Sequence, residues 1–94
     1  MKEVGRKYDK EKEQYDLVDP FALEDMARVL TYGAIKYDRY NWKNVEEHRY
    51  VSALMRHLQA YRKGEKLDDE SGISHLAHVM VNAMFLYCFE KERK

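Results

Sequence analysis

The sequence predicts a small all-α domain, a bundle of about three main helices. Apolar residues recur at helical spacing in three stretches, and no stretch shows the strict alternation of a half-buried strand. One proline and four glycines among 94 residues are few for a turn-rich β fold. A chain of this length buries only about 60–65% of its unfolded surface, so we expect oligomerisation, as a dimer or tetramer, to complete the bundle.

The first predicted helix opens at residues 19–20. Asp19 is a suitable N-cap, and Pro20 stands where its missing N–H removes no helical hydrogen bond. Apolar side chains then follow at helical spacing through Leu30. Either this helix ends at Gly33, which acts as its C-terminal cap, or it continues through Gly33 to Tyr37.

Two further helices follow an aromatic, polar connection over residues 36–43. The second helix is predicted over about residues 45–62 and ends at Gly64, and the third over about residues 71–91. Residues 71–89 contain no Asp, Glu, Lys or Arg, but polar groups crowd the first half, so we expect a helix buried in protein rather than a membrane span. The predicted core face of the second helix consists of Val51, Leu54, Met55, Leu58 and Tyr61.

Composition separates a charged arm, residues 1–18, from a single domain, residues 19–94. The arm has no apolar segment of the kind that a signal peptide needs, so we expect a cytoplasmic protein without a membrane partner. Seventeen basic residues balance seventeen acidic ones, which argues against stable nucleic-acid binding. A single cysteine, Cys88, excludes an internal disulfide and a cysteine-based zinc site.

Polar side chains follow one line of the third predicted helix. His75, His78 and Asn82 are spaced i, i+3 and i+7, which places them within about 60° of one another around the helix. Two imidazoles one turn apart can share a metal or a phosphate, and the amide can orient a water or a ligand. Three carboxylates, at residues 68–70, precede this helix.

The second predicted helix adds a third imidazole and a guanidinium. His57 shares a face with Ala53 and Ala60, whose small side chains let another element approach closely. Arg56 stays charged at any relevant pH and is a natural partner for phosphate. Carboxylates, imidazoles and an arginine on two neighbouring helices are typical of metal-assisted phosphoanhydride hydrolysis.

Each of these groups also has a structural explanation. A buried histidine is often a hydrogen-bonded core residue, and an acidic run often only stabilises a helix start. Trp42 can be a core or interface aromatic instead of a surface for stacking a base. Spacing alone leaves both explanations open.

Several short motifs, when they occur together, favour the functional explanation over the structural one. They are Gly33-Ala34-x-Lys36-Tyr37, Asn41-Trp42, Arg56-His57-Leu58, Gly64-Glu65, Asp68-x-Glu70-Ser71-Gly72 and His75-Leu76-Ala77-His78 with Asn82. With these motifs the chain closely resembles, over about residues 7–87, the phage and bacterial dATP/dGTP diphosphohydrolase N-terminal family. This family forms a MazZ-like branch near the MazG-type all-α nucleoside triphosphate pyrophosphohydrolases.

The resemblance implies hydrolysis of a purine deoxynucleoside triphosphate, dGTP or dATP, to the monophosphate and pyrophosphate. It also implies a divalent cation, an oligomeric MazG-like fold and the cytoplasm of a bacterium or a phage-infected host. MazG relatives bind Mg²⁺ with Glu-x-x-Glu and Glu-x-x-Asp pairs, whereas here His75-x-x-His78 resembles the second pair and Arg56-His57 stands near the first. Because imidazole prefers transition metals, Mn²⁺ or Co²⁺ is expected as an alternative to Mg²⁺.

Residue roles follow from the resemblance and the side-chain chemistry together. The expected catalytic residues are Glu70, His75, His78 and His57. The expected metal ligands are Asp69, Glu70, His75 and His78. The expected substrate-binding residues are Lys36, Tyr37, Asn41, Trp42, Arg56 and Asn82.

Two other classes of protein fit the same residues. A non-catalytic nucleotide- or metal-binding module would keep Arg56, Lys36 and the aromatic residues but release no pyrophosphate. A structural helical oligomer would use the histidines only as a buried hydrogen-bonded network. Incubation with nucleotide and metal, followed by chromatography for the monophosphate, separates the enzyme from both.

Overall fold

The computed structural model describes residues 10–93 and is all-α, as predicted. The helices α1 (Pro20–Tyr37), α2 (Glu47–Arg62) and α3 (His75–Glu92) form the body, and two short 3₁₀ turns precede α1 and α2. These turns are η1 (Tyr15–Leu17) and η2 (Asn41–Asn44). Within the described residues there is no strand, only an isolated bridge between Leu67 and Ser74.

Helix α1 begins where the sequence predicts and ends at the later of the two predicted positions. The Asp19 carboxylate accepts hydrogen bonds from the backbone N–H groups of Phe21 (2.8 Å) and Ala22 (3.4 Å), which confirms the N-cap. The helix passes through Gly33 and ends at Tyr37. A glycine inside a helix destabilises it by about 1 kcal/mol relative to alanine, so Gly33 is an unfavourable choice for the helix itself.

Helix α3 starts at His75, later than predicted, because the preceding residues fold into a compact loop. Gly64, with φ 97°, ends α2 as predicted. Backbone hydrogen bonds then close the loop: the Asp68 N–H donates to the Ile73 carbonyl (2.9 Å), and the Gly72 N–H donates to the Asp68 carbonyl (2.8 Å). The carboxylates of residues 68–70 therefore lie in this loop.

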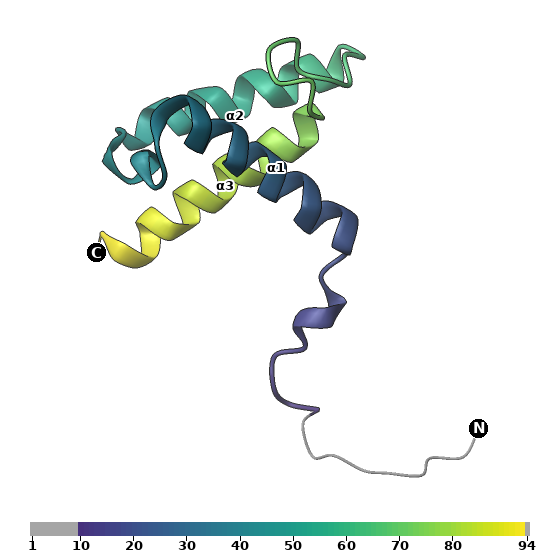
Figure 1. Cartoon of the computed structure of the whole chain (residues 1–94), viewed down its shortest axis with the longest axis vertical. Helices are drawn as coiled ribbons and strands as arrows, with labels where there is room; N and C mark the ends of the chain where they lie inside the picture. Colours follow the sequence, from purple (N-terminus) through teal and green to yellow (C-terminus); the bar gives the residue numbers. More distant parts are fainter. Residues whose placement is uncertain (1–9, 94) are drawn as a thin grey trace, which may run out of the picture.

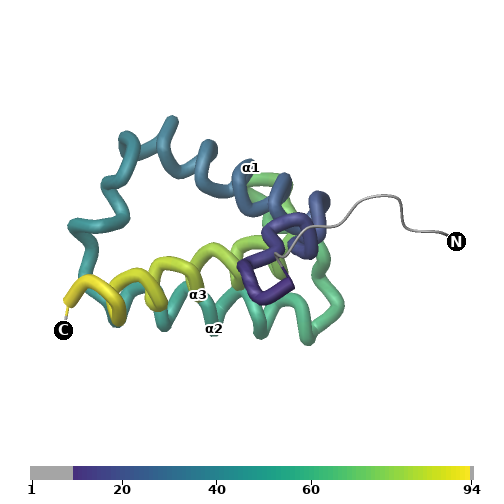
Figure 2. The backbone as a smooth tube through the Cα atoms, turned by 90° about the horizontal axis from the view of Figure 1, so that it is seen from below, coloured from purple at the N-terminus to yellow at the C-terminus, as the bar shows by residue number. Residues whose placement is uncertain are grey.

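Helices α2 and α3 lie side by side, and α1 crosses over the first half of α3 (Figures 1 and 2). The second half of α1 and the connection to α2 diverge from this pair (Figure 2). Apolar packing holds the crossing together, because Met26 and Leu30 pack against a small buried cluster. The members of that cluster are Val29, Ile73, Ala77 and Val81.

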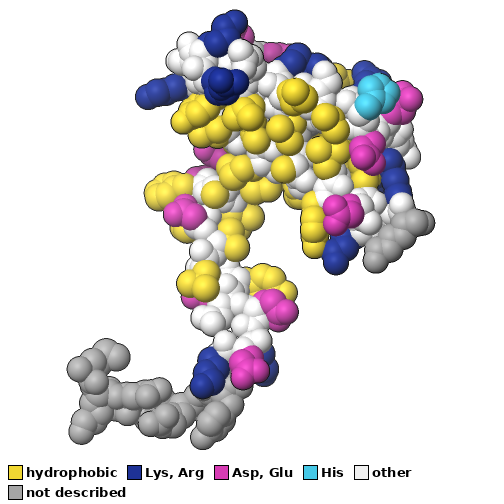
Figure 3. Space-filling model, turned by 180° about the vertical axis from the view of Figure 1, so that it is seen from behind, with side chains coloured by type: hydrophobic (Ala, Val, Ile, Leu, Met, Phe, Trp, Pro, Cys, Tyr) yellow, Lys and Arg dark blue, Asp and Glu magenta, His cyan; other side chains and the backbone are white. Residues whose placement is uncertain are grey.

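The predicted core face of α2 is wrong for four of its five residues in the single chain, and Leu54 alone among them is partly buried. Val51, Met55, Leu58 and Tyr61 are exposed, and Met55 has a relative exposure of 62%. The face that meets α3 instead carries Tyr50 and His57, whose rings contact aromatic and imidazole rings of α3. The small residues beside His57 allow this close approach, and the larger apolar side chains remain at the surface. Apolar side chains also gather on the face of the molecule shown in Figure 3.

The described part of the arm, residues 10–18, is exposed and extends away from the helices (Figure 1). The rest of the predicted arm, residues 1–9, lies outside the described residues. Among residues 10–93, no helix has both the length and the apolar character needed to cross a membrane.

Candidate functional site

Three imidazoles meet where the end of α2 lies against the start of α3. His57 Nδ1 lies 2.8 Å from His75 Nδ1. The rings of His57 and His78 stack, with centroids 4.3 Å apart and planes 8° from parallel. Both α3 histidines are buried, and His75 is only 4% exposed. The histidine line predicted from the sequence thus forms one cluster with His57.

The loop between α2 and α3 surrounds this cluster with polar groups. Glu65 Oε1 lies 3.0 Å from His75 Nε2. The Ser71 hydroxyl lies 2.8 Å from His78 Nε2. Asp68 Oδ2 accepts a hydrogen bond from the Ser71 N–H (2.8 Å) and lies 4.0 Å from His78 Nε2. The compact loop is therefore the element that brings these side chains to the imidazoles.

The hydrogen bonds fix where the protons lie when the imidazoles are neutral. The Glu65 carboxylate can only accept, so His75 donates from Nε2 and presents a lone pair at Nδ1. His57 then donates from Nδ1 to that lone pair, which leaves its own Nε2 unprotonated. Burial lowers the pKa of His57 to about 4, and the nearby His78 acts in the same direction. Burial also lowers the pKa of His78, although Asp68 opposes this.

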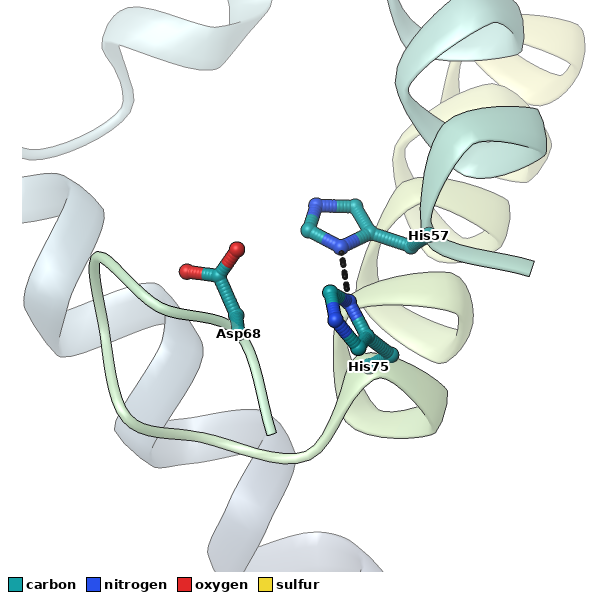
Figure 4. Close-up of side chains that lie close together, drawn as sticks. All are labelled: His57, Asp68 and His75. Atoms are coloured by element: carbon teal, nitrogen blue, oxygen red, sulfur yellow. Dashed lines mark hydrogen bonds between the residues drawn. The ribbon is translucent and has the colours of Figure 1, made fainter. Parts of the chain in front are cut away.

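A carboxylate joins two of the imidazoles in a group that can hold a metal ion. Ligand atoms of His57, Asp68 and His75 all lie within 4.8 Å of one another, and Figure 4 shows Asp68 facing the two rings. Burial alone would raise the pKa of Asp68, but hydrogen bonds from Ser71 outweigh it and lower the pKa, so the carboxylate is ionised. Two imidazoles and one carboxylate suit Mn²⁺, Co²⁺ or Zn²⁺ better than Mg²⁺, which prefers oxygen ligands.

A cleft of about 880 Å³ lies between α1, the connection to α2, and the α2–α3 pair. This volume is within the range of pockets that bind small molecules. His57, His78 and Asn82 line the side formed by α2 and α3. Aromatic and apolar residues line much of the remainder, among them Val29, Leu30, Tyr37, Trp42, Tyr50 and Phe85.

An ion pair crosses this cleft from α1 to the loop. Lys36 Nζ contacts Glu70 Oε2, and both residues line the cleft. The hydrogen bond from Lys36 holds the pKa of Glu70 below its ordinary value, and Tyr32 acts in the same direction. The same bond raises the pKa of Lys36. Glu70 is therefore held on the α1 side, as an anion beside a cation.

The cleft gathers most of the residues expected to bind substrate. Trp42 lines it while stacking on Phe85, with centroids 4.6 Å apart and an interplanar angle of 20°. Asn82 is buried and donates from Nδ2 to the His78 carbonyl (2.8 Å), which leaves its Oδ1 as an acceptor. The predicted substrate-binding residues among the lining are Lys36, Tyr37, Asn41, Trp42 and Asn82.

Two predicted site residues lie elsewhere. Arg56 is exposed on α2, outside the cleft lining, and its guanidinium donates to the Ser52 hydroxyl (3.0 Å). Asp69 is exposed and is not part of the group formed by His57, Asp68 and His75.

Three residues near the imidazoles were given no role from the sequence: Glu65, Asp68 and Ser71. The motifs Gly64-Glu65 and Asp68-x-Glu70-Ser71-Gly72 contain all three, but only the folded loop shows which side chains turn inward.

The fold and the site together define a small all-α domain whose cleft adjoins a candidate metal centre. Comparison with known proteins then assigns the family: the chain belongs to the dATP/dGTP diphosphohydrolase, N-terminal family, which it matches over residues 2–94. It is 39% identical over 84 residues to a dATP/dGTP diphosphohydrolase of Salmonella phage PMBT28. The aligned part is 89% of this chain but 29% of that relative, so the chain spans less than a third of its length. No solved structure matches the chain.

Proposed function

We propose that this domain binds a purine deoxynucleoside triphosphate in the cleft and hydrolyses it to the monophosphate and pyrophosphate with a divalent cation. One observation carries the proposal: the cleft is large enough for a nucleotide, and His57 belongs both to its lining and to the candidate metal group. The family and the relative's name support the substrate class. Base, triphosphate and cation can then all be held within one site.

The chemistry of the lining suggests how the nucleotide is oriented. Tyr37 and Trp42 offer aromatic surface for the base, and Asn41 lies beside them in the chain. Lys36 offers the positive charge that a triphosphate needs, so the phosphates lie toward Lys36 and the imidazoles. The Asn82 Oδ1 is free to accept a hydrogen bond from the sugar or the base.

The metal would be held by His57, Asp68 and His75, whose donor atoms fit a divalent transition metal. It would replace the hydrogen bond between His57 and His75, since the His75 Nδ1 lone pair cannot serve both. A bound cation would neutralise phosphate oxygens and activate a water as the nucleophile. Glu65 orients His75 by accepting its Nε2 proton, as carboxylates commonly do for histidine ligands. His78 is neutral and contacts the Ser71 hydroxyl, so it can take up a proton during the reaction. Arg56 and Asp69 stay candidates only if substrate binding rearranges the surface around them.

The direct test is incubation of the chain with each of the four deoxynucleoside triphosphates and Mg²⁺, Mn²⁺ or Co²⁺. Anion-exchange chromatography then measures the monophosphate and the pyrophosphate. We expect both products in equal amounts from dGTP or dATP, faster with Mn²⁺ or Co²⁺ than with Mg²⁺, and none with chelator. No product from any nucleotide with any of these metals would overturn catalysis by this domain.

A non-catalytic binding module is the second candidate, favoured by the small share of the relative that the chain spans. In that case the cleft binds the nucleotide, and residues outside this chain carry out the hydrolysis. Titration of dGTP into the chain separates the two candidates, because a module binds the nucleotide without releasing pyrophosphate. Absence of both binding and release would leave the histidine network as a structural feature.

We also propose that the chain forms a homo-oligomer. The exposed apolar side chains of α2, including Val51, Met55 and Leu58, support this, because a partner would remove them from water. Light scattering at micromolar concentration is expected to give a dimer or tetramer, and Met55→Lys is expected to shift it toward the monomer. A monomeric parent chain would overturn this proposal without affecting the proposed chemistry.

A further inference from the structure

Gly33 is a glycine that the fold of the chain does not require. It lies inside α1 and does not have a positive φ angle, so its backbone is open to any residue. A Cβ atom built on it would meet no heavy atom within 4 Å. Alanine would therefore fit this position and would favour the helix.

The position of Gly33 on α1 connects the packed part of the helix to the cleft. Val29 and Leu30, one turn earlier on the same face, pack in or against the buried cluster with α3. Lys36 and Tyr37, one turn later, line the cleft, as Gly33 does. Gly33 thus lies in the part of α1 that lines the cleft, between the residues that pack against α3 and Lys36.

The surface that Gly33 exposes is suited to a flat ring rather than to phosphate. In a helix interior the backbone N–H groups are already hydrogen-bonded along the helix, so they cannot donate to an anion. The lining one turn earlier on α1 is apolar at Leu30, and the cation of this wall, Lys36, lies one turn further on. Flat apolar surface followed by positive charge matches a base followed by its phosphates.

We propose that Gly33 is a specificity-determining residue, which leaves the α1 backbone bare so that a purine ring can lie against it. This inference rests on the proposed nucleotide function of the cleft. A purine has two fused rings and needs more room than a pyrimidine. A side chain at residue 33 therefore interferes more with a purine than with a pyrimidine.

The test compares Gly33→Ala and Gly33→Leu with the parent chain. We expect Gly33→Ala to raise the melting temperature by about 2–6 °C, because alanine favours the helix and meets no neighbour. We expect the same change to raise KM for dGTP and dATP about tenfold, the usual effect of a one-carbon misfit in a binding pocket. The inhibition constant of dCTP, measured against dGTP hydrolysis, should change less than threefold, and kcat for the purine nucleotides at saturation should be nearly unchanged. Gly33→Leu should raise the purine KM further.

Leu23→Ala is the matched control, since Leu23 is exposed on α1 and is not among the residues lining the cleft. It should leave KM for purine nucleotides and the inhibition constant of dCTP unchanged. If the parent chain binds nucleotide without hydrolysis, the dissociation constant from Trp42 fluorescence replaces KM.

Several results would overturn the inference. An unchanged purine KM in Gly33→Ala and Gly33→Leu would do so while leaving the proposed function intact. A lower melting temperature of Gly33→Ala would do the same, because it would mean that another protein surface packs against Gly33. A parent chain that neither binds nor hydrolyses nucleotides would remove the proposed function and this inference together. If Gly33→Leu does not fold, Gly33→Ala decides alone.

Discussion

The two walls of the cleft are built in different ways. On the α2–α3 wall, His78 and Asn82 are buried, as is His75, which contacts the lining residue His57, and hydrogen bonds from the loop and within α3 fix the positions of all three. On the α1 wall, the second half of the helix diverges from the pair, and Ile35 is 83% exposed. The second half of α1 meets the loop that carries the polar groups at the exposed ion pair between Lys36 and Glu70, beside Tyr32.

This difference suits the two walls to different tasks, chemistry on one and movement on the other. Chemistry that depends on exact proton positions needs side chains held by packing and by hydrogen bonds, and the α2–α3 wall supplies them. A wall with few buried contacts can move at low cost, and an exposed ion pair stabilises it only weakly. A nucleotide that binds the cleft as proposed would therefore enter by displacing the second half of α1 and Lys36 without disturbing the imidazoles.

His75→Ala tests the buried wall most strongly. It removes one proposed metal ligand and the hydrogen-bond partner of both His57 and Glu65. We expect kcat to fall by more than the roughly 10–100-fold typical of losing a residue that only orients a metal ligand, because His75 is itself a proposed ligand. Initial rates with Mn²⁺ measure the loss, and circular dichroism should still show a folded helical protein.

His48→Ala is the matched control for this prediction, because His48 is an exposed histidine on α2. It should retain full activity. If His75→Ala yields no folded protein, then the histidines serve a structural network. If it folds and keeps its activity, then the chemistry lies elsewhere.

Asp68→Asn and Asp69→Asn compare two adjacent carboxylates. The sequence assigns the metal to Asp69, whereas the structure groups Asp68 with His57 and His75. We expect Asp68→Asn to raise the metal concentration for half-maximal activity by about 10–100-fold, and Asp69→Asn to change it by much less. Activity measured against Mn²⁺ concentration checks this. A larger increase in this metal concentration for Asp69→Asn than for Asp68→Asn would instead make Asp69 the metal ligand.

The sequence was sufficient for the helices and for part of the site. Asp19 and Pro20 mark a helix start by local chemistry alone, and the line of His75, His78 and Asn82 depends only on helical geometry. Local rules of this kind do not need the tertiary structure. The all-α class followed from them, whereas the family was identified from the resemblance of several short motifs taken together.

The remainder of the site depends on contacts between distant residues. Glu65 reaches His75 only because the loop folds back on itself, and no periodic pattern describes such a loop. The core face of α2 was misassigned for a related reason. Apolar spacing identifies a face that avoids water, but the single chain packs the face of His57 against α3 and leaves Val51 and Met55 exposed.

Trp42→Ala tests the aromatic end of the cleft. Stacking a base on an aromatic ring contributes about 1–3 kcal/mol. One face of Trp42 is already covered by Phe85, so we expect the lower end, a rise in KM for dGTP of about fivefold. The value of kcat should fall little, because stacking acts equally on the ground and transition states.

Trp42→Phe is the control for this change, because it keeps a ring against Phe85. Trp42→Phe should therefore retain much of the affinity for dGTP and of the melting temperature that Trp42→Ala loses. An unchanged KM combined with a lower melting temperature in Trp42→Ala would make Trp42 a core residue only. Fluorescence of the parent chain gives a second check, since saturating dGTP should quench this single tryptophan.

The smallest expected effect concerns the stability of the metal-free protein as the pH falls. The ordinary pKa of histidine is 6.5, and burial beside His78 lowers that of His57 to about 4 in the folded protein. Between these values the unfolded chain binds a proton that the folded chain does not, so stability falls as the pH drops through this window. His78 has a lowered pKa and acts in the same direction. The ionised Asp68 opposes the lowering of both pKa values. The positive charge of Arg56 lowers the pKa of His57 further.

The carboxylates do not obscure this effect. Asp68 and Glu70 have pKa values below their ordinary values of 3.8 and 4.5, so their contributions are lost mainly below the histidine window. Because His57 is only partly buried, solvent screens part of this effect. Thermal unfolding in the presence of chelator should therefore show a melting temperature that is constant above about pH 7 and a few degrees lower, roughly 4 °C, at pH 5. In His57→Gln this dependence should be weaker, even if the variant is less stable at every pH, whereas His48→Gln should keep the parent's dependence. A melting temperature that stays constant from pH 7 to pH 5 in the parent chain would mean that water reaches the imidazoles, and that the buried wall is as open as the wall formed by α1.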